Sequence, residues 1–248
     1  MNGLGQKKWD HEGNFVVNPG ALKKYDTPRG AAKEYRGSSI IAFPSPEVQA
    51  VTGDLARGLM HRLAVARVDQ YLGEVLPENT HHATITEAGH DMSQDTQDDI
   101  RGITRSVNQR LLEQQPPLVA PQFEIHGQPK LVGNTSIVLF VEPTDDASWD
   151  AVHSIGSAYY NGLHRLGGDN EIANRKPEDF VGHITLAYLA QNKIPPDDYR
   201  KIKKVLDSYK YDRLVVPRFP LDHFDLSQYD SMAEWGAPLA RLTLPQAA

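Results

Sequence analysis

The order of hydrophobic and polar positions along the chain predicts short strands that alternate with amphipathic helices. Between residues 93 and 114, for example, apolar side chains recur at Ile100, Ile103, Val107 and Leu111, which is helical spacing. Helices are predicted over 46–64, 67–75, 93–114, 145–166 and 195–209. Strands are predicted over 38–44, 80–86, 123–128, 135–143, 180–189, 219–227 and 237–244.

The predicted elements follow one order twice. In each half, a strand with a His-x-Thr motif is flanked by helices and followed later by two further strands. No repeat of short period and no linker of low complexity separates the halves. The economical fold is therefore one α+β domain with two similar lobes over 36–248. Residues 1–35 are polar and rich in turn signals, and we expect them to form an irregular arm on that domain.

Composition and charge limit the classes of function. The 248 residues include no cysteine, which excludes disulfides and thiolate zinc sites. No apolar run is long enough to cross a bilayer and no secretory signal starts the sequence, so we expect a cytoplasmic protein without a membrane partner. The net charge of −6 argues against binding to long duplex nucleic acid, which needs a basic surface. A small phosphorylated nucleotide or an RNA terminus needs only a local pocket. The oligomeric state is left open.

Two segments a hundred residues apart carry the same pattern. PENTHHATIT (77–86) and PEDFVGHITL (177–186) both begin with Pro-Glu and reach a His-x-Thr within a strand-like run. Side chains alternate between the faces of a strand, so His82 and Thr84 project together, as do His183 and Thr185. If the two strands lie side by side, two imidazoles and two hydroxyls face one groove.

Strict alternation of side chains also predicts which face of the strand each residue next to the two motifs occupies. Thr86 continues the face of His82 and is a secondary candidate for contact with a ligand. Tyr188 falls on the opposite, apolar face, where packing in the core is favoured over stacking on a base. Gly182, just before the second motif, permits a bulge or a close approach of backbone.

Two histidines and two threonines in one groove suit phosphoryl transfer at a ribose hydroxyl. A neutral imidazole removes a proton from the attacking water or hydroxyl, and a protonated one donates a proton to the leaving oxygen. Histidine serves both roles near neutral pH because its ordinary pKa is about 6.5. Threonine hydroxyls donate hydrogen bonds to phosphate oxygens, where negative charge develops. This chemistry requires no metal and no other cofactor, and the pattern leaves open which histidine is the base.

At these motifs the chain resembles the two-histidine (2H) phosphoesterases, a superfamily with one His-x-Thr/Ser-x motif in each lobe. The matching segments are HATI (82–85) and HITL (183–186), and the likeness covers most of 36–245. It implies a bilobal fold with pseudo-twofold symmetry, two antiparallel sheets with helices outside, and a central groove. It also implies that His82 and His183 are catalytic and that Thr84 and Thr185 contact phosphate. Family activities include hydrolysis of 2′,3′-cyclic phosphates and RNA-end processing, so a phosphoric diester hydrolase is expected.

The sequence leaves three other interpretations. His81, His82, His90 and Asp91 could suggest a metal cluster, but their spacing fits no zinc pattern, and adjacent strand residues point to opposite faces. The same groove could instead hold a nucleotide or a phosphorylated metabolite without turnover, as a binding module. In the third interpretation the chain is an interaction protein, and the two motifs are coincidental.

Overall fold

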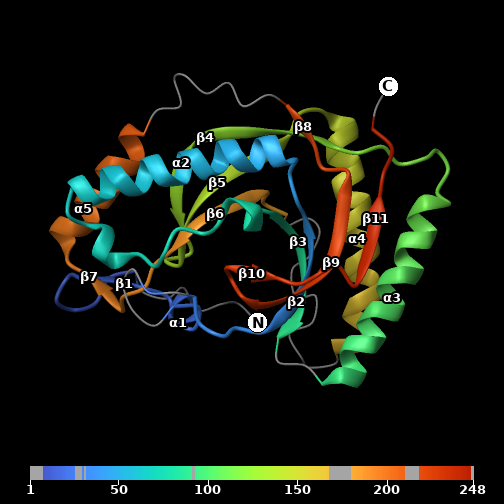
Figure 1. Ribbon diagram of the computed structural model, residues 1–248, viewed down its shortest axis with the longest axis horizontal. Helices are drawn as coiled ribbons and strands as arrows, with labels where there is room; N and C mark the ends of the chain where they lie inside the picture. The colour runs from blue at the N-terminus through green and yellow to red at the C-terminus, as the bar shows by residue number, and fades with distance from the viewer. Residues whose placement is uncertain are drawn as a thin grey trace.

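The computed structural model describes residues 8–25, 30, 32–90, 93–167, 180–209 and 218–246, which are organised by one large antiparallel sheet (Figure 1). The strands of this sheet are β2 (Gly37–Ala42), β3 (Ala83–His90), β4 (Gln122–Val132), β5 (Ser136–Pro143), β6 (His183–Tyr188), β8 (Phe219–Pro220), β9 (His223–Ser231), β10 (Glu234–Trp235) and β11 (Ala240–Thr243). A small second sheet pairs β1 (Phe15–Val16) with β7 (Lys193–Ile194). The helices are α1 (Pro19–Leu22), α2 (Pro46–Val65), α3 (Gln94–Leu112), α4 (Asp146–Gly167) and α5 (Pro196–Ser208). The predicted α+β class is confirmed.

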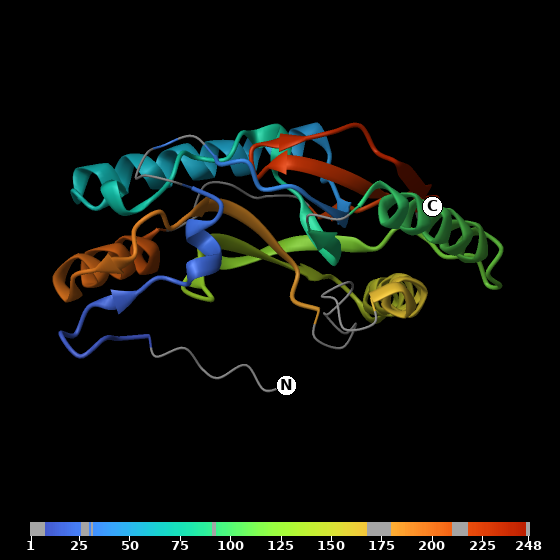
Figure 2. The same ribbon diagram turned by 90° about the horizontal axis from the view of Figure 1, so that it is seen from below.

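The long helices pack outside the sheet in two pairs. α2 contacts α5 at one end of the molecule and α3 contacts α4 at the other (Figures 1 and 2). Each pair reaches a strand that carries a motif, because α2 packs on β6 and α4 packs on β3. The apolar faces of α2 and α4 are buried through Leu55, Leu59, Leu63, Ile155, Tyr159 and Leu163. Each motif strand is therefore packed against a long helix on the outer face of the sheet.

The two halves of the sheet exchange strands that are distant in the sequence. The strand order is β10-β9-β2-β3-β6-β5-β4-β8, with β11 paired to β9. β4 and β5 follow β3 in the chain, but β5 pairs with β6 and β4 with β5, whereas β9 returns from the C-terminal end to pair with β2. The halves meet at the pair Ala83↔Ile184 between β3 and β6. The two expected sheets are therefore two halves of one continuous sheet.

The predicted helices agree with the observed ones except over 67–75. There the structure has only a 3-10 turn at Asp69–Tyr71. The backbone at Arg67 is left-handed (φ 57°), which ends the helical path after α2. Leu72 then becomes extended and bridges to Leu189 beyond β6. The prediction of a second helix was wrong because this tertiary strand contact overrides local helical preference.

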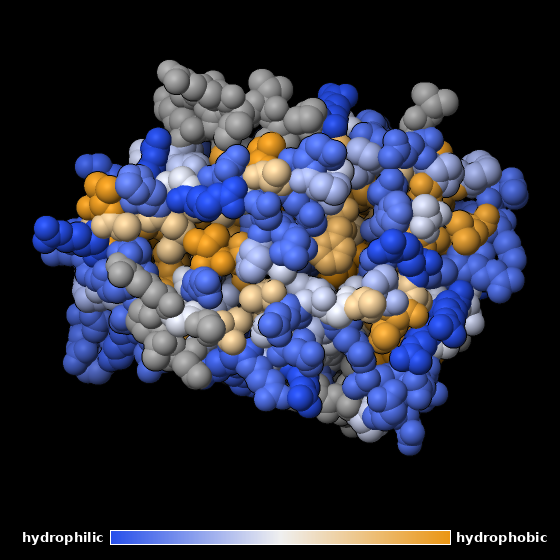
Figure 3. Space-filling model, viewed as in Figure 1, coloured by the Kyte–Doolittle hydropathy of each residue, from blue (hydrophilic) through white to orange (hydrophobic). Residues whose placement is uncertain are grey.

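The surface seen in Figure 3 is mainly hydrophilic, and hydrophobic side chains form only small separate patches between polar ones. This distribution is ordinary for a chain with 23% charged residues. None of the helices in the described ranges is both long and apolar enough to span a membrane.

The N-terminal arm is more ordered than its composition suggested. β1 pairs with β7, and the buried ring of Phe15 lies 5.6 Å from that of Trp9 and 4.4 Å from that of Tyr199, measured between centroids. Asn18 caps the single turn of α1, where its side chain accepts a hydrogen bond from Gly20 N–H at 2.8 Å. These contacts fix the described part of the arm, from Trp9 to Leu22, against the second half of the fold.

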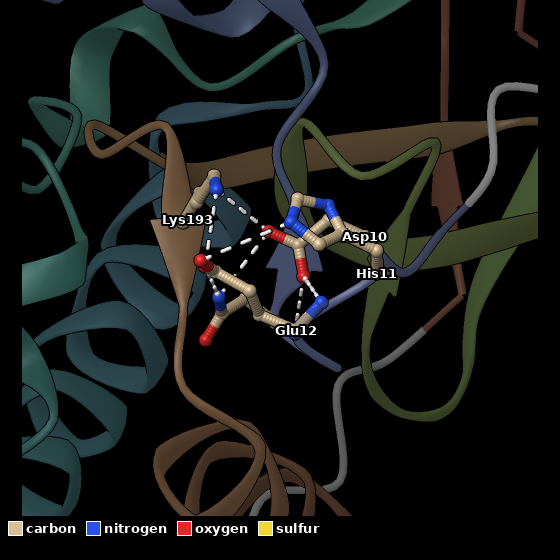
Figure 4. Close-up of polar contacts among 5 residues, drawn as sticks. Asp10, His11, Glu12 and Lys193 are labelled. Atoms are coloured by element: carbon tan, nitrogen blue, oxygen red, sulfur yellow. Dashed lines mark hydrogen bonds and ion pairs between the residues drawn. The ribbon is translucent and has the colours of Figure 1, made fainter.

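A polar cluster around Asp10 fastens the arm to β7 (Figure 4). The Asp10 carboxylate accepts hydrogen bonds from the backbone N–H groups of Glu12 (3.0 Å) and Asn14 (2.8 Å). It also forms an ion pair with Lys193 at 2.7 Å, and Glu12 lies 3.5 Å from the same ammonium. The hydrogen bond from Lys193 holds the pKa of the Asp10 carboxyl well below its usual range.

Replacing Asp10 by asparagine is expected to lower the melting temperature at neutral pH. A carboxyl whose pKa is lower in the folded state adds stability above its unfolded pKa of about 4, and this contribution is lost as the pH falls further. The difference between wild type and variant should therefore be present at pH 7 and shrink below about pH 4. Glu12→Gln removes a more exposed carboxylate at a longer distance and is the control. Equal melting temperatures at pH 7 would contradict the role of Asp10.

Candidate functional site

A cavity of about 290 Å³ opens where the two halves of the sheet meet. His82, Thr84, His183 and Thr185 all line it, although the two motifs are separated by about a hundred residues of sequence. Thr86 does not line the cavity and is only 2% exposed. The structure therefore brings four of the five predicted site residues together and leaves the fifth in the interior.

Strand pairing explains how the four residues meet. Ala83 lies opposite Ile184 in an antiparallel pair. Continuing this register by one residue in each direction sets His82 across from Thr185 and Thr84 across from His183. Each histidine thus faces the threonine of the other motif, which is the arrangement that a twofold axis between two antiparallel strands produces.

Both imidazoles are oriented by the same local hydrogen bond. Nδ1 of His82 lies 2.7 Å from the carbonyl oxygen of Thr80, and Nδ1 of His183 lies 2.9 Å from that of Val181. A carbonyl oxygen only accepts hydrogen bonds, so Nδ1 carries the proton and donates in both cases. Nε2 is therefore the nitrogen that exchanges protons at each site.

A β-bulge follows each motif, and the two bulges place the next residues on the opposite side of the sheet from the one that the sequence predicted. On β3 the register passes from Ile41↔Thr84 to Ile40↔Thr86, which leaves Ile85 as an extra residue. On β6 the same step occurs at Leu186. An extra residue reverses the alternation of side chains.

After each motif, the bulge changes which of two successive residues faces the cavity. Glu87 lines the cavity in place of Thr86, and Tyr188 lines it in place of Ala187. The prediction that Thr86 shares the ligand-facing side of His82 is therefore wrong, and so is the assignment of Tyr188 to the face turned away from the groove.

The environment of His82 favours its neutral form. Its ring lies 4.4 Å from the ring of Trp235 and 5.9 Å from that of Phe43, measured between centroids. Burial lowers the pKa of His82 to about 4, and positive charge on His183 lowers it too, while the hydrogen bond to the Thr80 carbonyl acts in the opposite direction. At neutral pH His82 therefore has an unprotonated Nε2, as a general base requires.

Sequence reasoning missed the part of the cavity wall that the arm and the C-terminal strands contribute. Lys24 and Tyr35 come from the N-terminal region, and Tyr229 and Trp235 come from β9 and β10. His90 lies between two tyrosine hydroxyls, 3.3 Å from Tyr35 and 3.0 Å from Tyr229. These residues carry no repeated pattern, so only the fold could place them.

The histidines weighed as a metal cluster do not form one in the described part of the chain. His81 is buried, and its Nδ1 lies 2.7 Å from the Thr52 hydroxyl on α2, on the opposite side from the cavity-lining His82. Asp91 lies outside the described residues. Within those residues, no group of three or more histidine, aspartate or glutamate side chains is arranged to hold a metal ion.

Of three comparisons with known proteins, only the comparison with solved structures finds similar proteins. No family model matches the sequence, and no curated protein matches it. The structure of a conserved protein of unknown function from Agrobacterium tumefaciens is similar with a TM-score of 0.61 at 12% identity, over 97% of this chain and 100% of that one. Structures of E. coli LigT are similar at lower scores, with 86% of this chain and 100% of LigT covered. The TM-score is 0.44 at 13% identity for the apo form and 0.45 at 12% identity for the complex with NADP+. The chain therefore shares its fold with the Agrobacterium tumefaciens protein along almost its whole length.

Proposed function

We propose that the protein is a metal-independent phosphoesterase of the two-histidine kind. Its substrate would be a 2′,3′-cyclic or other ribose-linked phosphate of a small nucleotide or of an RNA terminus. The observation that carries this proposal is the pairing of the two motifs. His82 and His183 line one cavity, each hydrogen-bonded through Nδ1 to a backbone carbonyl, with a threonine of the other motif opposite.

The proposed reaction assigns a separate role to each histidine. Nε2 of His82, neutral because burial lowers the pKa of this residue, removes a proton from the attacking water. A new P–O bond forms as the bond to one ribose oxygen breaks. Protonated His183 donates its Nε2 proton to that leaving oxygen, which yields a phosphate monoester and a ribose hydroxyl. The hydroxyls of Thr84 and Thr185 donate hydrogen bonds to the non-bridging oxygens.

The direct test is turnover of a panel of 2′,3′-cyclic nucleotides and of an oligonucleotide with a cyclic phosphate end, in the presence of EDTA. The expected result is conversion of at least one member to a 2′- or 3′-phosphate, separated by ion-exchange chromatography. Activity that EDTA abolishes and added metal restores would overturn the proposal. Binding of these compounds without any conversion would favour the binding module instead.

Replacing Thr84 or Thr185 by valine is expected to lower kcat by about ten- to hundredfold, the factor for one lost hydrogen bond to a charged group, because each change removes one donor to the phosphate oxygens. Valine keeps the volume and the branched shape, so the fold should be retained. Thr86→Val is the matched control, since this threonine is buried away from the cavity. A Thr86 variant as impaired as the other two would show that the strand faces are assigned wrongly.

The dependence of kcat/KM on pH is expected to be bell-shaped. On the acidic side activity should fall with an apparent pKa near 4, since protonation removes the base at His82. On the alkaline side it should fall as the second histidine loses the proton that it must donate. Steady-state rates between pH 3 and 9 at constant ionic strength measure both limbs. A profile that falls on neither side of its plateau in this range would argue against paired acid and base histidines.

A further inference from the structure

The cavity contains one fixed positive charge among the described residues that line it. Among the lining residues that the structure describes, Lys24 is the only lysine or arginine and Glu87 is the only acidic residue. Lys24 belongs to the N-terminal arm and follows α1 by two positions. The arm therefore contributes the one described lining side chain that carries a positive charge independently of histidine protonation.

Lys24 lies between the two halves of the fold. Its ammonium is 3.2 Å from the hydroxyl of Tyr188 and 4.4 Å from the centroid of that ring, on β6. It is 5.3 Å from the ring centroid of Tyr35, which precedes β2 in the other half. Both tyrosines line the cavity, so the cation that contacts them lies at the cavity wall.

The groups that contact this ammonium in the described part of the chain are uncharged. They are one tyrosine hydroxyl and two aromatic rings, and Glu87 acts on it only through longer-range electrostatics. Burial by itself lowers the pKa of Lys24, but the interactions with Tyr188 and Tyr35, together with the negative charge of Glu87, raise it above its ordinary value. Lys24 is therefore protonated at neutral pH, and a partly desolvated cation with neutral neighbours is strongly stabilised by an anion that enters the cavity.

The positive charge of Lys24 also reaches the catalytic pair, since it contributes to the lowered pKa of His82. An anion placed beside Nε2 of His82 is therefore within its field. We propose that Lys24 binds the anionic oxygens of the phosphate held between the two motifs, which makes the N-terminal arm a part of the ligand site. The inference rests on the proposed function in one respect, because it takes the ligand to be a phosphate compound.

The experiment measures binding of inorganic phosphate by isothermal titration calorimetry to the full chain at pH 7 and low ionic strength. Lys24→Met removes the ammonium group and keeps an unbranched stem of the same four atoms in length, and Lys24→Arg keeps the charge. Lys23→Met is the matched control, because it removes the same charge from the neighbouring exposed position, outside the cavity wall. Thermal unfolding of each variant without ligand checks that the fold is retained.

Lys24→Met is expected to raise the Kd for phosphate by about ten- to hundredfold, the factor for one lost hydrogen bond to a charged group. Lys24→Arg should stay within about threefold of wild type, and Lys23→Met should bind as wild type does. The inference is overturned if Lys24→Met and Lys23→Met bind phosphate equally, or if the wild type does not bind phosphate at millimolar concentration. Should Lys24→Met prove unstable, loss of binding in Lys24→Gln with the arginine variant unaffected gives the same support.

Binding of phosphate does not depend on turnover, so the two proposals fail separately. A wild type that binds phosphate through Lys24 but converts no cyclic phosphate contradicts the phosphoesterase and leaves the role of Lys24 supported. A wild type that converts substrate, with KM and kcat unchanged in Lys24→Met, retains the phosphoesterase and removes Lys24 from the site.

Discussion

Alanine in place of His82 or His183 is expected to lower kcat for a cyclic phosphate by about 10²–10⁴, the range for removal of a general acid or base. The fold should survive either change. Each imidazole lines the cavity, and its Nδ1 bonds to a backbone carbonyl only two residues earlier in the chain. Rates measured on the panel member with the highest wild-type turnover, together with thermal unfolding of each variant, provide the test.

The double variant gives a sharper result than either single one. If the two histidines act on the same reaction step, removing both should cost little more than removing one, because such effects are far from additive. His126→Ala is the control: this histidine is also on a strand, but it is exposed on β4 and lies 3.7 Å from Glu142. A single histidine variant within threefold of wild type would remove that residue from the mechanism.

The core of the candidate site could be predicted from the sequence because it depends on short-range geometry alone. A His-x-Thr in a strand places its two side chains on one face, whatever the rest of the fold does. Duplication of the motif then suggested that the two faces meet. The cavity lined by His82, Thr84, His183 and Thr185 agrees with this prediction.

Prediction failed where an extra residue or a distant segment decides the geometry. The bulges at Ile85 and Leu186 reverse the side-chain alternation, and no pattern of residue types marks them. Lys24 reaches the cavity because β1 pairs with β7, a contact between segments almost 180 residues apart. The exchange of strands between the halves was not predicted either: β4 belongs to the half that contains β6, and β9 pairs with β2 in the other half.

Gly182→Ala is expected to cost about 3 kcal/mol of unfolding free energy, at the upper end of the range for overpacking. A Cβ atom at Gly182 would lie 2.3 Å from the backbone carbonyl oxygen of Val141, well inside van der Waals contact. The two residues also share a backbone hydrogen bond, from Val141 N–H to the Gly182 carbonyl at 3.0 Å. Backbone has no rotamer with which to move aside, so β5 and the start of β6 must separate. Of the two possibilities that the sequence left open for this glycine, the close approach of backbone is the one observed.

Displacement at Gly182 should also reduce activity, although neither histidine is altered. His183 is the next residue, and its ring is oriented by the Val181 carbonyl on the other side of the glycine. A shift of the backbone there moves Nε2 of His183 relative to the phosphate, and misplacement by about 1 Å can cost about a hundredfold in rate. Gly102→Ala is the control, because a Cβ at that exposed position of α3 meets no atom within 4 Å and should stabilise the helix by about 0.5–1 kcal/mol. Denaturant unfolding and kcat, measured on both variants well below their melting temperatures, separate lost stability from lost geometry. A Gly182 variant with wild-type stability and wild-type kcat would mean that β5 does not press on the backbone before His183, and that this contact does not position the second histidine.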